Sequence, residues 1–117
     1  MKALFKCKDG ATVSVIAGVG CYSTPRGSGP WSAVEAGFPT SDIPDSWKKY
    51  AEDADYSNTV FGWMPVPLLQ DYFDLHGGLR PAGRLEWVAL KRGYDELNPV
   101  PFDADEYRRQ AGLEEED

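Results

Sequence analysis

The sequence predicts an α+β domain with a mainly antiparallel sheet of about five strands and two or three short helices. A leading pair of alternating segments is joined by an Asp-Gly turn, which is typical of a β-hairpin. Short apolar segments then alternate with segments that carry helix-start and helix-stop residues. With 117 residues and 13.0 kDa, the chain suits one core. We expect a single ligand-binding domain over residues 1–112 and an acidic tail over 113–117.

Residues 2–7 and 11–17 are expected to form the hairpin. In the first segment apolar residues alternate with lysines, and in the second Val13 and Val15 alternate with hydroxyl side chains. Each segment therefore has one face for a core. Asp9-Gly10 supplies the tight turn between them.

A loop, a strand and a helix follow. Residues 18–30 are rich in glycine and serine, and we expect an ordered loop because Val19, Cys21 and Tyr22 can anchor its base. Residues 31–38 predict a third strand. That strand would place four side chains on one face: Ser32, Val34, Ala36 and Phe38. A short helix capped by Ser41 or Asp42 then runs through Tyr50, with Pro44 in its first turn.

The remaining elements are two strands and two helices. Residues 59–64 predict a fourth strand, and a clearer helix begins at Pro67 and ends at Gly77. After a turn at 80–83, residues 85–90 predict a fifth strand. Residues 102–110 predict a short helix, because acidic residues come first and arginines last.

The fourth strand raises a question about its two faces. Phe61 and Trp63 are expected to share one face, opposite Val60 and Met64. Both faces are apolar, so one of them must look away from the main core of the sheet or meet a second chain.

The charge is acidic and unevenly spread. The chain has 12 basic and 19 acidic side chains, a net charge of −7, and residues 114–117 are all acidic. This total argues against binding of nucleic acid or of an anionic membrane surface, while it leaves room for one basic pocket. No apolar stretch approaches the ~20 residues of a membrane-spanning helix. Without a signal peptide in its first residues, and with two cysteines, the chain is expected to be cytoplasmic and reduced.

Most catalytic patterns are missing. We interpret the single histidine, His76, as the C-terminal residue of a helix, rather than as the partner of a nucleophilic Cys7 or Cys21. One histidine and two cysteines do not make a usual structural zinc site. The run Asp53-x-Asp55-x-Ser57 lacks the glycine and the glutamate of a calcium loop. We therefore expect no catalytic residue, no metal and no cofactor.

Two segments favour binding of a small anionic ligand. In residues 24–30 a single guanidinium, Arg26, is flanked by Gly27 and other small residues. Arginine binds phosphate oxygens through two parallel hydrogen bonds, and glycines let backbone N–H groups approach an anion. Residues 98–109 could fold over a ligand as a lid. Plainer interpretations stay open, namely a mobile turn for the first segment and a charged surface helix for the second.

Several runs of residues together resemble a family of small phage proteins. They are Val13–Val15, Cys21–Arg26, Gly29–Pro39, Tyr50–Asp53, Thr59–Pro67 and His76–Gly78. Over residues 11–78 the chain resembles the anti-Thoeris sponges, whose members bind the cyclic ADP-ribose signals made by TIR-domain enzymes. The net charge of −7 and the acidic tail depart from what we expect of that family.

The resemblance implies an anti-defence protein that captures a cyclic ADP-ribose isomer intact, in the cytoplasm of the infected bacterium. It also implies a homodimer or larger homo-oligomer with ligand pockets between protomers. Arg26, next to Gly27, is then the phosphate-contacting residue. A C-terminal segment would close the pocket, with either of its two arginines in contact with the ligand. The residues of this segment are Asn98, Phe102, Asp103, Arg108 and Arg109.

Two other functions stay open. The acidic stretch 42–55 and the tail could imitate DNA and occupy the basic groove of a host or CRISPR nuclease. Paired carboxylates such as Asp103 and Asp105 could instead serve a small nucleotide hydrolase. Recovery of intact ligand from heated protein separates capture from turnover, and salt-sensitive binding to a basic protein identifies the mimic.

Overall fold

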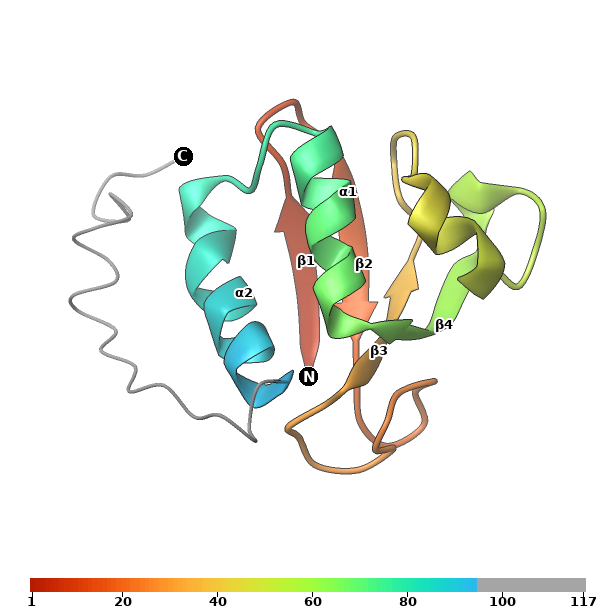
Figure 1. Cartoon of the computed structure of the whole chain (residues 1–117), viewed down its shortest axis with the longest axis vertical. Coiled ribbons are helices and arrows are strands. Elements are labelled where there is room, and N and C mark those ends of the chain that lie inside the picture. Colours follow the sequence, from red (N-terminus) through yellow and green to blue (C-terminus); the bar gives the residue numbers. More distant parts are fainter. Residues whose placement is uncertain (95–117) are drawn as a thin grey trace.

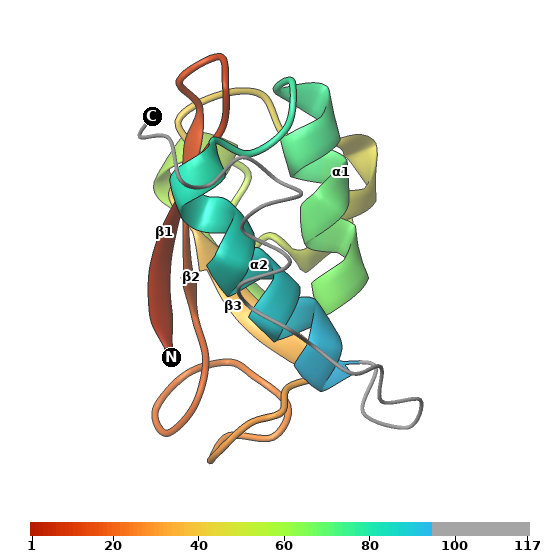
Figure 2. The ribbon, with the colours of Figure 1, turned by 90° about the vertical axis from the view of Figure 1, so that its left-hand side faces the viewer.

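The computed structural model describes residues 1–94, which form a four-stranded antiparallel sheet with helices packed on one face (Figures 1 and 2). The strands lie in chain order: β1 (Lys2–Lys6), β2 (Thr12–Ile16), β3 (Ala33–Gly37) and β4 (Val60–Pro65). The helices are the 3₁₀-helices η1 (Asp45–Tyr50), η2 (Tyr56–Asn58) and η3 (Val66–Leu68), and the α-helices α1 (Leu69–Leu75) and α2 (Pro81–Tyr94). The predicted α+β class is confirmed, with four strands in the sheet. In this part of the chain no helix is both long and apolar enough to span a membrane.

The predicted hairpin is present. β1 and β2 pair in register from Lys2 opposite Ile16 to Lys6 opposite Thr12. In the turn, Gly10 has a φ of 95°, a conformation that glycine adopts without strain. The Asp9 carboxylate accepts a hydrogen bond from the amide of Ala11 at 2.9 Å, so the Asp-Gly pair forms the turn as expected.

The third and fourth strands differ from the predicted alternation. Val34 and Ala36 are buried, but Ser32 lies outside β3, and Phe38 has a φ of 52° and is 55% exposed. In β4 the pairing with β3 shifts register between Val34 and Ala36.

This irregularity changes which β4 side chains are buried. Phe61 and Met64 are both fully buried, while Trp63 is 49% exposed with a φ of 50°. The expected common face of Phe61 and Trp63 is therefore wrong. A β-bulge adds a residue to one strand and so breaks the period-two pattern on which the expectation rested.

Residues 80–94 overturn one predicted element. The predicted turn and fifth strand at 85–90 are instead part of α2, which begins at Pro81. Proline suits the first turn of a helix because it has no N–H to leave unpaired there. Trp87 and Leu90, three residues apart, are the buried residues of α2. These two side chains pack on the face of the sheet. A fifth strand would instead have had to pair with a free edge of the sheet.

The two earlier helices agree better with the sequence. The helix expected up to Tyr50 is present as the 3₁₀-helix η1, but it begins at Asp45 with Pro44 as its N-cap, so the expected caps Ser41 and Asp42 are wrong. The helix expected from Pro67 is present as η3 continued by α1. Gly77, with a φ of 84°, follows its end, as a C-terminal glycine is expected to do.

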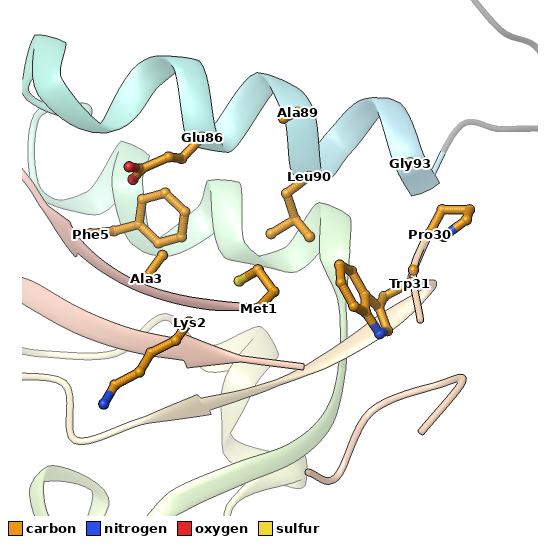
Figure 3. Close-up of a pocket in the computed structure, with 11 residues that line it drawn as sticks. Met1, Lys2, Ala3, Phe5, Pro30, Trp31, Glu86, Ala89, Leu90 and Gly93 are labelled. Atoms are coloured by element: carbon orange, nitrogen blue, oxygen red, sulfur yellow. The ribbon is translucent and has the colours of Figure 1, made fainter. Parts of the chain in front are cut away.

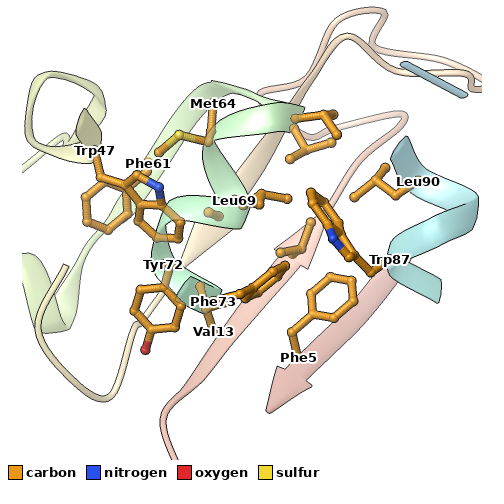
Figure 4. Packing of buried hydrophobic residues seen from close by; sticks show 14 of the residues in the cluster. Phe5, Val13, Trp47, Phe61, Met64, Leu69, Tyr72, Phe73, Trp87 and Leu90 are labelled. Atoms are coloured by element: carbon orange, nitrogen blue, oxygen red, sulfur yellow. The ribbon is translucent and has the colours of Figure 1, made fainter. Parts of the chain in front are cut away.

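The core lies between the sheet and the helices and is rich in aromatic rings (Figure 4). Phe73 of α1 contacts Phe5 of β1 and Trp87 of α2, with ring centroids 5.4 and 5.0 Å apart. Trp47 of η1 stacks on Tyr72 at 5.0 Å. Because burial of one large apolar side chain contributes about 1.5–3 kcal/mol, these rings hold each helix against the sheet.

The other face of the sheet carries no helix in residues 1–94 (Figure 2). We call it the open face. Strand pairing and burial place these side chains on it: Lys2, Leu4, Lys6, Thr12, Ser14, Ile16, Glu35 and Val60.

Candidate functional site

The loop of residues 18–30, between β2 and β3, is held by polar contacts at its base. Ser23 is buried, and its hydroxyl accepts a hydrogen bond from the amide of Gly18 at 3.0 Å and donates one to the carbonyl of Pro25 at 2.8 Å. The amide of Thr24 donates to Ala33 at 3.0 Å. Val19, one of the expected anchors, is 89% exposed. The loop is therefore ordered as predicted, but a serine anchors it where an apolar residue was expected.

Arg26 lies on the surface of this loop. Its side chain is exposed and makes no hydrogen bond or ion pair within the described chain. The following carbonyl, that of Gly27, accepts a hydrogen bond from the indole Nε1 of Trp31 at 3.1 Å. The guanidinium is thus accessible to a ligand, next to a backbone segment that an aromatic side chain fixes.

Two cavities lie on either side of Trp31. The first, of about 420 Å³, lies between β1, α2 and residues 29–31 (Figure 3). The second, of about 670 Å³, lies between residues 16–29 and the N-terminal end of β1. Both are lined by Lys2, Gly29 and Trp31. Their volumes are in the range of small-molecule sites, about 300–1,000 Å³.

The first cavity is largely apolar. Its walls come from β1, α2 and the loop, and include Phe5, Pro30, Trp31 and Leu90. Figure 3 shows the Trp31 ring beside Leu90, while Lys2 extends away from α2. α2 approaches the loop closely, since a Cβ on Gly93 would lie 2.9 Å from the Cβ of Pro30. Such a cavity suits a flat, weakly polar group such as a nucleobase.

The second cavity is also lined mainly by apolar groups, but it includes a glycine-rich segment and the side chain of Lys2. Gly27, Ser28 and Gly29 contribute lining, and Lys2 lies at the end of β1. Gly29 has no room for a side chain, because a Cβ there would lie 2.6 Å from the Trp31 ring. Exposed backbone N–H groups and an ammonium group suit a phosphate. The two cavities together place an aromatic ring next to a lysine and a glycine-rich segment.

The sequence predicted part of this site. Gly27 lines the second cavity, whereas Arg26, in the same loop, lines neither cavity. Lys2 and Trp31 were missed, because they were assigned to strands. A tryptophan directly after Gly29-Pro30 was the available indication of a ring next to the loop. The predicted C-terminal residues lie outside the described residues: Asn98, Phe102, Asp103, Arg108 and Arg109.

A third cavity, of about 740 Å³, lies near η1 and η2. Its walls include Asp42, Asp45 and Lys48. Lys48 is already paired with Asp45 at 2.8 Å, and this hydrogen bond lowers the pKa of the Asp45 carboxyl. The site therefore carries uncompensated acidity, which makes it less suited to an anionic ligand than the cavities beside Trp31.

His76 is a structural residue. Its Nδ1 lies 2.7 Å from Oδ2 of Asp9, and its Nε2 lies 2.7 Å from the carbonyl of Asp42. The hydrogen bond from the Ala11 amide lowers the pKa of the Asp9 carboxyl most, and the hydrogen bond with His76 lowers it further. Both ring nitrogens are engaged within the protein, so His76 ties three segments together as a helix C-terminal residue.

The two cysteines are free thiols. Burial raises the pKa of Cys7 to about 11, which keeps this thiol protonated at neutral pH, and only the thiolate is strongly nucleophilic. Among residues 1–94, no group of three or more His, Cys, Asp or Glu side chains is arranged to hold a metal ion. Asp53 and Asp55 instead accept hydrogen bonds within their own turn.

Comparison with protein-family models, with curated proteins and with solved structures finds no match for this chain. The resemblance over residues 11–78 therefore stays a prediction, and the arrangement around Trp31 is what the structure adds to it.

Proposed function

We propose that this protein is a binding protein that captures a cyclic ADP-ribose isomer intact, and that it acts as a phage anti-defence sponge in the cytoplasm of an infected bacterium. The observation that carries the proposal is the pair of cavities that share Trp31, Lys2 and Gly29, in the loop that also carries the exposed Arg26. We further propose that the protein is a homo-oligomer, as the sponge family implies.

The chemistry of the ligand suits the site. A cyclic ADP-ribose isomer has an adenine, two phosphates and ribose hydroxyl groups. The base would lie against Trp31 in the apolar cavity, since stacking on an aromatic side chain contributes about 1–3 kcal/mol. The phosphates would lie over residues 27–29, where Lys2 supplies positive charge, and the exposed Arg26 of the same loop would turn toward them.

Several groups must act together for tight capture. A Kd of ~1 nM corresponds to about −12 kcal/mol, whereas one charge-assisted hydrogen bond contributes about 1.5–3 kcal/mol. The binding free energy that Arg26 alone can contribute is therefore insufficient, and the proposal requires the aromatic and backbone contacts as well.

The DNA-mimic alternative gains no support from residues 1–94. This part of the chain has ten acidic and ten basic side chains, so the charge of −7 belongs to residues 95–117. A DNA mimic needs a large excess of carboxylates on a folded surface, and residues 1–94 have a net charge of zero.

The test is a calorimetric titration of the full chain with a panel of cyclic ADP-ribose isomers and with linear ADP-ribose. We expect one isomer to bind, and saturation at about 100 times Kd to stabilise the fold by ~2.7 kcal/mol, about 10 °C in Tm. Arg26→Ala should weaken binding about 10- to 100-fold and leave the unliganded Tm unchanged, because the side chain is exposed. Lys8→Ala, an exposed cation in the β1–β2 turn, is the matched control and should bind normally.

Ligand released by heating should be chemically unchanged. Absence of heat and of a Tm shift with every isomer would overturn the proposal, and recovery of a cleaved product would replace capture with catalysis.

A further inference from the structure

Three of the eight side chains assigned to the open face are apolar, namely Leu4, Ile16 and Val60. Antiparallel sheets with one solvated face alternate apolar and polar residues, with the polar ones facing water. Here Leu4, in the middle of β1, is 67% exposed. The paired row that begins at Leu4 crosses the sheet through Ser14 and Gly37 and reaches Val60 on β4. Apolar side chains therefore lie at both ends of a central row.

A stacked aromatic pair borders the same face. The amide of Tyr22 donates to Glu35 Oε1 at 3.0 Å, and the Tyr22 and Trp63 rings stack at 4.8 Å. Gly62 leaves room for this pair, since a Cβ there would lie 3.3 Å from Cβ of Tyr22. Trp63 is half exposed, and its backbone has a φ of 50°. A left-handed backbone costs about 1–2 kcal/mol for such a residue, and strain of this kind clusters at functional sites.

Charges divide between the two edges of the open face. Lys2 and Lys6 are exposed on β1. Beyond β4, the amide of Glu52 donates to the carbonyl of Val60 at 3.1 Å, which places Glu52 at the end of the row that begins at Leu4. Exposed carboxylates follow it at Asp53 and Asp55. One edge is therefore basic and the opposite edge acidic.

We propose that the open face binds a second copy of this chain, about a two-fold axis parallel to the strands. Such an axis lays β1 of each protomer over β4 of the other, so the basic edge meets the acidic edge twice. Leu4 then meets Val60, and Lys6 lies beside Glu52. An axis across the strands would set the two lysine edges against each other, so the charge pattern selects the first arrangement.

The size of the face sets the strength of this contact. Four strands of five or six residues cover about 300 Å² in projection, whereas a stable interface buries about 800 Å² on each partner. The Tyr22–Trp63 pair and residues 51–55 extend the surface. We therefore expect a dimer with a micromolar Kd, formed independently of any ligand.

The test is sedimentation velocity on the full chain from about 1 µM to about 300 µM. The wild type should pass from monomer to dimer. Lys6→Glu and Glu52→Lys should each raise the dimer Kd about tenfold or more, and the double variant should return it close to the wild-type value. Leu4→Glu should abolish the dimer. Lys49→Glu, an exposed lysine on η1, is the matched control and should leave the Kd unchanged.

All these side chains are exposed, and an unchanged Tm would show that each variant folds. A wild type that is monomeric at the highest concentration overturns the inference. A dimer that survives Leu4→Glu, or that is not restored by the double variant, also overturns it. This inference deepens the homo-oligomer of the proposed function, so a monomer that binds nucleotide would overturn both of these but leave ligand capture standing. A dimer that binds no nucleotide would overturn ligand capture alone.

Discussion

The two faces of one sheet behave differently although the same strands supply both. On the covered face Phe5, Val13 and Phe61 are fully buried under the helices. On the open face Leu4, the neighbour of Phe5, is 67% exposed. Stability is therefore concentrated on one face, which leaves the other free to make contacts with partners.

The largest effect should come from the covered face. Phe73→Ala removes a ring that packs on both Phe5 and Trp87, and should cost about 3–5 kcal/mol in the free energy of unfolding. Leu4→Ala on the open face should change it by less than about 0.5 kcal/mol at concentrations where the protein is monomeric. Urea denaturation monitored by tryptophan fluorescence measures both. Equal costs would show that the open face also belongs to the core.

High pH should lower the free energy of unfolding through two titratable groups that are buried on the covered face. Burial raises the pKa of Cys7 to about 11 and that of Tyr72 to about 12. In the unfolded chain these groups lose their protons near pH 9 and pH 10 respectively. The unfolded state therefore binds fewer protons above pH 9, and stability falls as the pH rises, by about 2 kcal/mol at pH 10.

Cys7→Ala and Tyr72→Phe should each flatten this alkaline decline. Cys21→Ala is the control for the first, because Cys21 is only partly buried. Chemical denaturation from pH 7 to pH 11 measures the decline. A curve whose slope is the same in all variants would assign it to other groups.

The smallest effect concerns the strained end of β3. Phe38 has a φ of 52° and is 55% exposed. Both Phe38→Gly and Phe38→Ala remove the ring, but only glycine relieves the left-handed backbone, so the glycine variant should be more stable than the alanine variant by about 1 kcal/mol.

The same pair at Leu4, which lies in regular strand, should show the reverse order, because glycine weakens a strand. Thermal melts of the four variants measure the two differences. An alanine variant at least as stable as glycine at position 38 would contradict the assigned backbone conformation.

The sequence predicted the elements whose cause is local. The β1–β2 hairpin follows from alternation and from Asp9-Gly10, and the end of α1 follows from Gly77. The segment 85–90 was wrong because its apolar residues fit strand and helix alike. Only the tertiary contacts of Trp87 with Phe5 of β1 and Phe73 of α1 decide between helix and strand.

The candidate site was predicted in part for the same reason. The glycines around Arg26 indicate an anion-binding loop from composition alone. Trp31 directly follows that loop, so its ring could have been assigned to the site from the sequence. Lys2 joins the site only because residues 1–2 line the same cavity as residues 27–29, and no spacing in the sequence expresses that.

The amino-acid order by itself determined the fold class, the alternating buried side chains of the hairpin, and a guanidinium among small residues. These features depend on neighbours within a few residues. Tertiary structure alone decided that α2 is a helix, that Trp63 stays exposed beside Tyr22, and that two cavities meet at Trp31. Each of these depends on the energy of contacts between segments far apart in the chain, which exist only once the sheet and its helices have packed.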